Sequence, residues 1–284
     1  MSVFYCDSNC ELWYDQVDEL GIKFISMPYT IDGEEYYYDL GKNTDLHAFF
    51  EKMRKGAVAK TSALNMTEYI EIFEPDLKAG EDIIYVTFSH KMSGTFSSLQ
   101  KAIDELATRY PDRKITVVDS KGISVSAGMV VYFSAKLHNE GASDEEVVKF
   151  VESFRDKVKC YFTVADLEYL KRGGRLSGAA TLFGKILDIK PIISNVDGKL
   201  ESVAKVKGRK NALKRLTGAL ESDGVDTSYP IVVLEADNEK DKNIVYDYVK
   251  EHYPDAKIWV TKIGPVIGSH CGPDTIGLIF VANK

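Results

Sequence analysis

Short runs of almost purely apolar residues, each followed by a stretch of helical periodicity, limit the folds open to this 284-residue chain more than any other feature. Strands that are buried on both faces appear in sequence as continuous apolar runs, and their alternation with helices is typical of a parallel sheet covered on both sides. The first half therefore predicts strands at 3–6, 23–27, 83–88 and 115–118, with helices near 12–20, 45–55, 67–77, 94–110 and 126–139.

The second half has a different pattern. Ser143 and Glu146 form a capping box at the start of a helix that we expect to reach about residue 158. Asp197-Gly198 lies between two apolar segments and predicts a β-hairpin. Further strands are predicted at 160–164, 231–234, 258–260 and 276–281, with helices near 211–221 and 238–253. The expected fold class is α/β with two domains, a mostly parallel α/β/α sheet domain over 1–158 and a smaller α+β domain over 159–284.

The charge of the chain excludes some classes of function. Its net charge of −7 argues against a general nucleic-acid binder, because such proteins neutralise phosphates with clustered lysine and arginine. The first residues lack the basic and apolar segments of a signal peptide, and no window approaches the roughly 18 to 20 apolar residues of a membrane span. We therefore expect a cytoplasmic protein with no nucleic-acid partner.

The four cysteines are scattered along the chain rather than spaced as a framework. Only Cys6 and Cys10 are close enough in sequence to suggest a local pair, and no histidine stands at ligand spacing from them. We expect reduced thiols and no metal site, as is usual for a cytosolic chain of this size.

A hydroxyl-rich motif, Ser93-Gly94-Thr95, lies between the predicted strand at 83–88 and the helix that follows it. Ligands of open α/β sheets bind at the carboxyl ends of the strands, and a helix N-terminus offers unpaired amides to an anion. Ser93 and Thr95 would supply hydroxyls, and Gly94 would let the backbone approach the ligand. The simpler interpretation is that Ser93 only caps its helix, which contributes about 1 kcal/mol.

Two further polar pairs occupy similar positions. Thr61-Ser62 precedes the helix near 67–77, and Asp119-Ser120 ends the strand at 115–118. Each pair is either another wall of the same crevice or an ordinary cap or turn.

A segment rich in glycine and proline near the end of the chain, 264–273, predicts a rigid loop that holds His270. A lone histidine is usually structural, but small neighbours on both sides would leave its imidazole able to donate to a ligand anion. The enzyme alternative is a serine-dependent hydrolase or acyltransferase with Ser93 as nucleophile, His270 as base and Asp119 as the orienting acid. The G-x-S-x-G elbow of such enzymes is absent, because Lys91 stands two positions before Ser93.

Positive charge in this acidic chain gathers in two places. Arg172 lies at a predicted helix end, and Arg175 lies beyond that end, where its planar guanidinium suits a carboxylate or phosphate. Lys207 and Arg209 belong to a basic run at 205–210, which is either a solvated face or a patch for an acidic partner or for transient contact with an anionic membrane surface. These four residues are candidate contacts to a partner or to the head group of a ligand.

Taken in order, these motifs resemble the DegV family, whose members include the fatty-acid-binding subunits of bacterial fatty-acid kinase. The chain departs from the family pattern after its Thr-Ser pair, where it has Ala63-Leu64-Asn65, and at Asp274. The matching segments span nearly the whole chain: Thr61-Ser62, Ser93-Gly94-Thr95, Val118-Asp119-Ser120, 166–177, 189–192, 205–210 and 268–273.

The resemblance implies a lipid-binding carrier rather than an enzyme, with a long-chain fatty acid as ligand and no other cofactor. It places the acyl chain in an apolar tunnel and the head group near the interface of the two domains, where Thr61 and Ser93 would bond the carboxylate with Ser62 and His270 close by. It also implies a partner, the catalytic subunit of fatty-acid kinase, that would convert the carboxylate to an acyl phosphate. The chain itself has no G-x-x-x-x-G-K-[ST] loop for ATP. A carrier of another small anionic ligand remains the third alternative.

Overall fold

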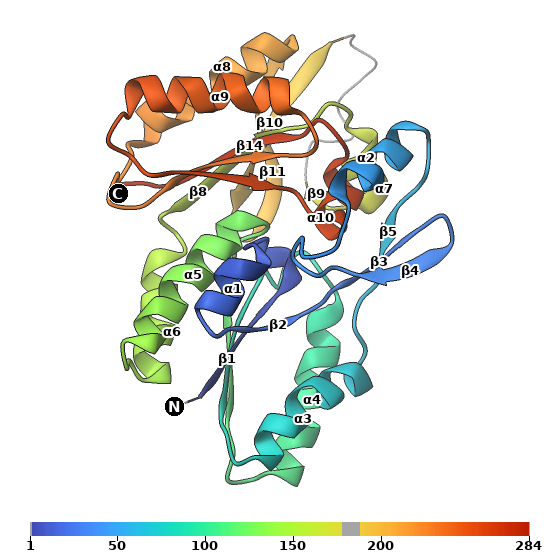
Figure 1. The fold of residues 1–284 in the computed structure, drawn as a ribbon, viewed down its shortest axis with the longest axis vertical. Coiled ribbons are helices and arrows are strands. Elements are labelled where there is room, and N and C mark those ends of the chain that lie inside the picture. Colours follow the sequence, from blue (N-terminus) through green and yellow to red (C-terminus); the bar gives the residue numbers. More distant parts are fainter. Residues whose placement is uncertain (1, 178–187, 284) are drawn as a thin grey trace.

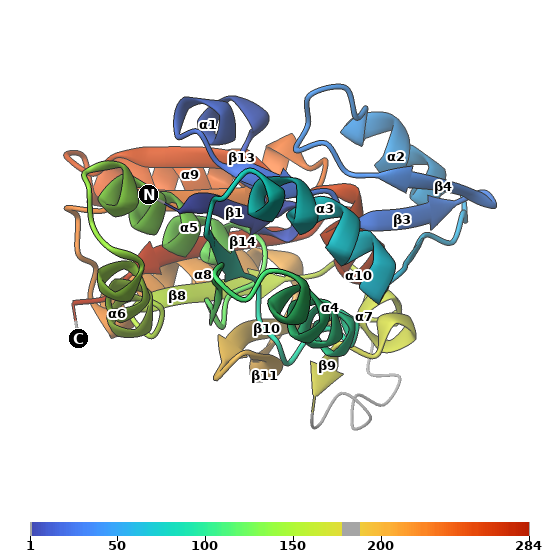
Figure 2. The same ribbon diagram turned by 90° about the horizontal axis from the view of Figure 1, so that it is seen from below.

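A parallel sheet of four strands forms the first part of the computed structural model, which describes residues 2–177 and 188–283. The strand order is β2-β1-β6-β7, and every neighbouring pair is parallel, as predicted. Figures 1 and 2 show α3 and α4 on one side of this sheet and α5 and α6 on the other. The elements are β1 (Val3–Asp7), η1 (Ser8–Cys10), α1 (Tyr14–Glu19), β2 (Lys23–Ile25), α3 (Met66–Lys78), β6 (Ile83–Thr87), α4 (Thr95–Arg109), β7 (Ile115–Asp119), α5 (Val125–Asn139) and α6 (Asp144–Phe154).

Side-chain caps fix where two of these helices begin. The Ser143 hydroxyl accepts the N–H of Glu146 at 3.3 Å, and the Glu146 carboxylate accepts the N–H of Ser143 at 2.8 Å, so the predicted capping box is confirmed. Asn65 and Glu68 form a second capping box at the start of α3. Helix α6 ends at Phe154 rather than near 158, because the next strand already begins at Val158.

The structure also contains a small antiparallel sheet that the sequence analysis does not predict. It contains β3 (Pro28–Ile31), β4 (Glu34–Tyr37) and β5 (Lys60–Thr61), and α2 (Leu46–Arg54) lies between β4 and β5 in the chain. The predicted strand at 23–27 ends at Ile25. The chain then forms the β3–β4 hairpin through Asp32 and Gly33, whose φ angles of 55° and 83° fit the two positive-φ positions of a type I′ turn.

A mixed sheet of seven strands forms the second part, in the order β13-β12-β14-β8-β10-β11-β9. The predicted hairpin at Asp197-Gly198 is confirmed, since Val196 of β10 pairs with Lys199 of β11. Helices α8 and α9 cover the face of this sheet that points away from the first sheet (Figure 1). The elements are β8 (Val158–Thr163), α7 (Glu168–Gly173), β9 (Leu176–Ser177), β10 (Ile189–Val196), β11 (Lys199–Lys207), α8 (Arg209–Asp223), β12 (Ile231–Glu235), α9 (Glu239–His252), β13 (Ile258–Lys262), α10 (Pro265–Cys271) and β14 (Ile276–Val281).

The two parts meet through α5, which contacts β8 and β14, and through α10, which contacts β3 and β5 of the small antiparallel sheet. The expected α/β class is confirmed, while the boundary between 158 and 159 stays a prediction. Across residues 2–177 and 188–283, no helix combines the length and the apolar character that a bilayer crossing requires.

Candidate functional site

A mostly apolar cavity lies where the carboxyl ends of the first sheet face the large sheet and α10. It holds about 860 Å³ of atom-free space, part of it open to solvent. Strands of the large sheet and loops at the carboxyl ends of the first sheet contribute mostly apolar walls, so the cavity suits a ligand with a substantial hydrocarbon part. Its apolar walls include Phe88, Ile123, Phe162, Leu200, Leu234 and Val266.

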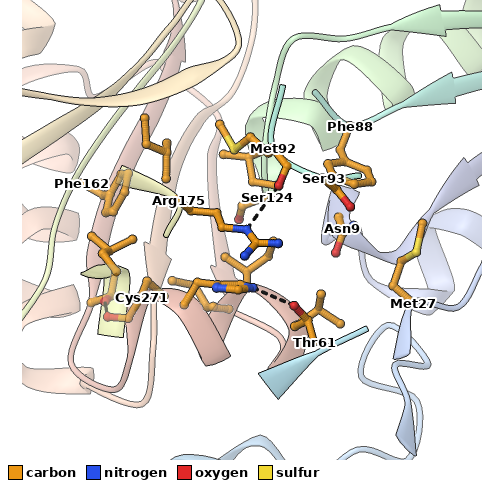
Figure 3. Close-up of a pocket in the computed structure, with 18 of the residues that line it drawn as sticks. Asn9, Met27, Thr61, Phe88, Met92, Ser93, Ser124, Phe162, Arg175 and Cys271 are labelled. Carbon is orange, nitrogen blue, oxygen red and sulfur yellow. Dashed lines mark hydrogen bonds between the residues drawn. The ribbon is translucent and has the colours of Figure 1, made fainter. Parts of the chain in front are cut away.

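Polar side chains gather in the same cavity from four separate segments (Figure 3). Thr61 ends β5, Ser93 precedes α4, Arg175 lies between α7 and β9, and His270 belongs to α10. The Oγ1 atom of Thr61 and the Nε2 atom of His270 form a hydrogen bond of 2.8 Å. Ser62, next to Thr61, is exposed and also lines the cavity. The structure thus brings together residues that the sequence analysis selects from distant motifs.

His270 lies in a helix, so the expectation of a rigid loop over 264–273 is wrong. Pro265 occupies the first turn of α10, where a missing N–H costs nothing. Burial, together with the nearby charge of Arg175, lowers the pKa of His270 to about 4. The imidazole is therefore neutral at pH 7, and its Nδ1 atom is buried without a partner among the described residues.

The hydroxyls of the Ser93-Gly94-Thr95 motif have different surroundings. Ser93 accepts the N–H of Thr95 at 3.2 Å, so it contributes to the start of α4 while it lines the cavity. The Thr95 hydroxyl is buried and bonds the Tyr69 hydroxyl at 2.9 Å. Gly94 is exposed at the N-cap position, directly before the helix begins at Thr95. Ser93 is thus the hydroxyl of this motif that is better placed for a ligand.

Arg175 is the predicted cation that reaches the cavity. Its Nε atom donates to the Met92 carbonyl at 3.3 Å, and Nη1 donates to the Gly173 carbonyl. These two bonds hold the guanidinium at the cavity wall, near enough for its charge to depress the pKa of His270. A fixed guanidinium at this position is suited to an anionic head group.

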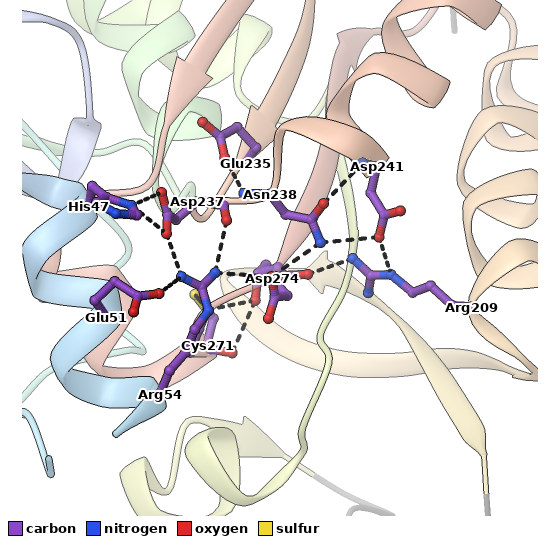
Figure 4. A network of polar contacts seen from close by, with 12 residues as sticks. His47, Glu51, Arg54, Arg209, Glu235, Asp237, Asn238, Asp241, Cys271 and Asp274 are labelled. Atoms are coloured by element: carbon purple, nitrogen blue, oxygen red, sulfur yellow. Dashed lines mark hydrogen bonds and ion pairs between the residues drawn. The ribbon is translucent and has the colours of Figure 1, made fainter. Parts of the chain in front are cut away.

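The other predicted cations lie outside the cavity lining. Arg172 is exposed, with its guanidinium 5.6 Å from the ring centre of Tyr169. Lys207 is exposed at the end of β11. Arg209 donates to the Asp241 carboxylate at 2.8 Å and to the Asp274 carbonyl, and both bonds serve the local structure (Figure 4).

Asp274 points into a polar network rather than toward the head-group residues (Figure 4). Its carboxylate accepts from Arg54 at 3.0 Å and from Asn238 at 3.2 Å. Arg54 also pairs with Asp237 and, at 2.8 Å, with Glu51. The network ties α2 to the loops at the ends of β12 and α10.

The three residues of the hydrolase alternative are not linked. The Nε2 atom of His270 bonds Thr61 instead of Ser93. Asp119 accepts the N–H of Lys121 at 2.7 Å and lies 4.0 Å from the imidazole of His90, so Asp119-Ser120 behaves as a turn. The geometry of these residues gives no support to a serine nucleophile activated by His270.

Some polar residues of this region are absent from the sequence-based candidates. Asn9 and Ser124 line the cavity. Ser124 donates to Glu11, a buried carboxyl that also accepts the N–H of Gly264 at 2.6 Å. The signal that could have indicated Asn9 is its position just after β1, since strand ends of a parallel sheet share one edge.

The four cysteines are buried free thiols, and Cys6 and Cys10 are neighbours with their sulfur atoms 3.7 Å apart. Burial raises the pKa of Cys160 to about 12 and that of Cys271 to about 12. These two thiols line the cavity as uncharged, weakly polar groups.

Comparison with known proteins gives one consistent result. The family model described as "Uncharacterised protein, DegV family" matches residues 5–283. A DegV domain-containing protein of Clostridium perfringens is 36% identical over 283 residues, covering 99% of this chain and 97% of the relative. Two solved structures cover 99% of this chain and 99% of their own: a fatty-acid-binding DegV family protein from Thermus thermophilus (28% identity, TM-score 0.86) and DegV, a fatty acid binding protein from Bacillus subtilis (26% identity, TM-score 0.85). The chain belongs to the DegV family.

Proposed function

We propose that this protein binds a long-chain fatty acid in the cavity and presents its carboxylate to a separate kinase. The observation that carries the proposal is the cavity itself, whose apolar walls meet the cluster of Thr61, Ser93, Arg175 and His270. The fatty-acid-binding relatives of Thermus thermophilus and Bacillus subtilis support the same ligand.

The apolar walls and the polar cluster of the cavity contribute differently to the binding free energy. Each buried methylene contributes about 0.8 kcal/mol, so a long acyl chain offers on the order of 10 kcal/mol before ordering costs. A hydrogen bond to a charged group contributes about 1.5 to 3 kcal/mol. The apolar walls therefore set most of the affinity, and Thr61 and Ser93 set the direction of the ligand.

The head group would lie between the Thr61 and Ser93 hydroxyls with Arg175 beside it. His270 is neutral at pH 7 and can donate a hydrogen bond only from the nitrogen that holds its proton. In this arrangement His270 positions the Thr61 hydroxyl through the bond of 2.8 Å. Ser62 and Gly94 are exposed, and Ser62 also lines the cavity.

The kinase step is the finer part of the proposal. A carboxylate held by hydroxyls at the solvent end of the cavity is accessible to a second protein that carries ATP, and the acyl phosphate would stay bound by its chain. Arg172 and Lys207 are exposed, so both can contact such a partner or, transiently, an anionic membrane surface. We propose that the protein acts in the cytoplasm as this carrier, without catalysis of its own.

The first experiment identifies the ligand directly. Purified protein is analysed by native mass spectrometry and then extracted with organic solvent, and the released material is identified. We expect a single long-chain fatty acid per chain and rebinding of that acid to the extracted protein. Release of a different small anion, or failure of any fatty acid to rebind, would contradict the proposal.

A second experiment tests the kinase step by trapping acyl phosphate with hydroxylamine. Fatty acid, ATP and the catalytic subunit of a fatty-acid kinase should give hydroxamate only when this protein is added. Hydroxamate formed by this protein and ATP alone would contradict the carrier assignment.

A further inference from the structure

Asn9 is a buried polar residue of the cavity that the proposed function does not use. The residue is 4% exposed, and its Oδ1 atom has no hydrogen-bond partner among residues 2–177 and 188–283. Asn9 nevertheless lines the same cavity as Thr61 and Ser93 (Figure 3). Buried acceptors in folded proteins are nearly always paired, so this oxygen requires a donor that the described protein does not supply.

Asp7 fixes the backbone at Asn9. Its carboxylate accepts the backbone N–H of Asn9 at 3.0 Å. The backbone of Asn9 is therefore anchored, while Oδ1 of its side chain has no partner among the described residues. Asp7 is itself held by the Tyr85 hydroxyl at 3.0 Å and the Phe88 N–H at 3.2 Å.

The sheet topology places Asn9 at the polar end of the cavity. Strands β1 and β6 are parallel neighbours, so their carboxyl ends lie at one edge of the sheet. Asn9 follows β1, and Ser93 follows β6. A carboxylate offers only acceptor oxygens and cannot satisfy Oδ1, whereas a hydroxyl group near the carboxylate can donate to it.

We propose that Asn9 is a specificity-determining residue that selects acyl chains with a hydroxyl group at C2 or C3, the first two carbons after the carboxyl carbon. The inference rests on the proposed fatty-acid function. The ligand hydroxyl donates to Oδ1 of Asn9 while the carboxylate bonds Thr61 and Ser93. An unhydroxylated chain leaves the oxygen unpaired and binds about tenfold or more weakly.

Calorimetric titration of the delipidated protein tests this preference. The ligands are hexadecanoate, 2-hydroxyhexadecanoate, 3-hydroxyhexadecanoate and, as a control for polarity elsewhere in the chain, 12-hydroxyoctadecanoate. We expect one of the first two hydroxy acids to bind about tenfold or more tightly than hexadecanoate, with no such gain for the control. Asn9→Leu should abolish the preference and keep hexadecanoate binding, whereas Asn211→Leu, an exposed change on α8, should keep the preference.

Each other outcome has a defined meaning. Equal affinity of the wild-type protein for all hexadecanoates overturns the inference and leaves the fatty-acid function standing, and this comparison needs no variant. A preference that survives in Asn9→Leu also overturns the assignment to Asn9, with Asn9→Val as the substitute should the leucine variant not fold. Failure of every acid to bind overturns the proposed function and this inference with it.

Discussion

The Thr61 hydroxyl lies 2.8 Å from the Nε2 atom of His270, although the two residues are 209 positions apart in the chain. Thr61 ends a short strand of the small antiparallel sheet, and His270 belongs to α10 beside the large sheet. One hydrogen bond therefore joins the two structural parts at the polar end of the cavity.

Thr61→Val should weaken fatty-acid binding about tenfold, because it removes a hydroxyl from the charged head group and keeps the volume of the side chain. Titration calorimetry with hexadecanoate measures the effect. Thr30→Val is the matched control, since Thr30 lies on β3 of the same small sheet and outside the cavity lining. Equal losses in the two variants would count against a direct role of Thr61.

Ser93→Ala should have two separable effects. Fatty-acid affinity falls about tenfold with the loss of a bond to the carboxylate. Stability falls by about 1 kcal/mol, because the N–H of Thr95 loses its acceptor. Native mass spectrometry reports the loading and urea unfolding reports the stability, with Ser97→Ala in the first turn of α4 as control. Unchanged loading would argue against the assignment of Ser93.

Gly173→Ala should disturb the head-group site without touching a hydroxyl. A Cβ atom at Gly173 would lie 2.2 Å from Nδ1 of His270, so the imidazole must shift from the position in which its Nε2 atom bonds Thr61. We expect weaker fatty-acid binding than in the wild-type protein. Gly218→Ala is the control, because nothing lies within 4 Å of its new Cβ and an alanine favours α8. Identical affinities of both variants would contradict this account of Gly173.

The free energy of unfolding should decrease as pH rises from about 4.5 to about 8, because Glu11 stays protonated in the folded protein over this range and loses its proton in the unfolded chain. Burial raises the pKa of Glu11 from 4.5 to about 8, so between these values the folded state binds more protons than the unfolded state. Glu11→Gln should make this decline shallower by up to about 1.4 kcal/mol per pH unit. Urea unfolding at pH 5 and pH 8 measures it, with the exposed Glu81→Gln as control. An unchanged slope in Glu11→Gln would refute the prediction.

Elements that bury both faces, or that end in a characteristic turn, could be predicted from the sequence. The strand Ile83–Thr87 is buried throughout, so its apolar run identifies it at once. The hairpin at Asp32-Gly33 has an equally good turn signal, but all four residues of β4 are exposed and show no apolar alternation. Its pairing depends on contacts made elsewhere in the fold.

The site likewise contains features that the sequence indicates and features that only the fold reveals. Glycines near His270 suggest a loop, yet Gly268 lies inside α10. A Cβ atom there would be 2.9 Å from the ring of Phe50, so close packing accounts for this glycine. A glycine needed for close packing cannot be told from a glycine needed for a turn without the neighbouring element. Asn9 becomes a cavity residue only once β1 and β6 are known to be adjacent.

The residues of the polar cluster come from two separate portions of the coding sequence, and this affects how ligand preference can evolve. Thr61 and Ser93 are encoded before the large sheet begins at Val158, whereas Arg175 and His270 are encoded after it. A recombination event that exchanged one portion between two paralogues would inherit half of the cluster from each parent. Mutations that change the ligand preference are therefore expected to arise as compensating pairs, one in each portion of the coding sequence.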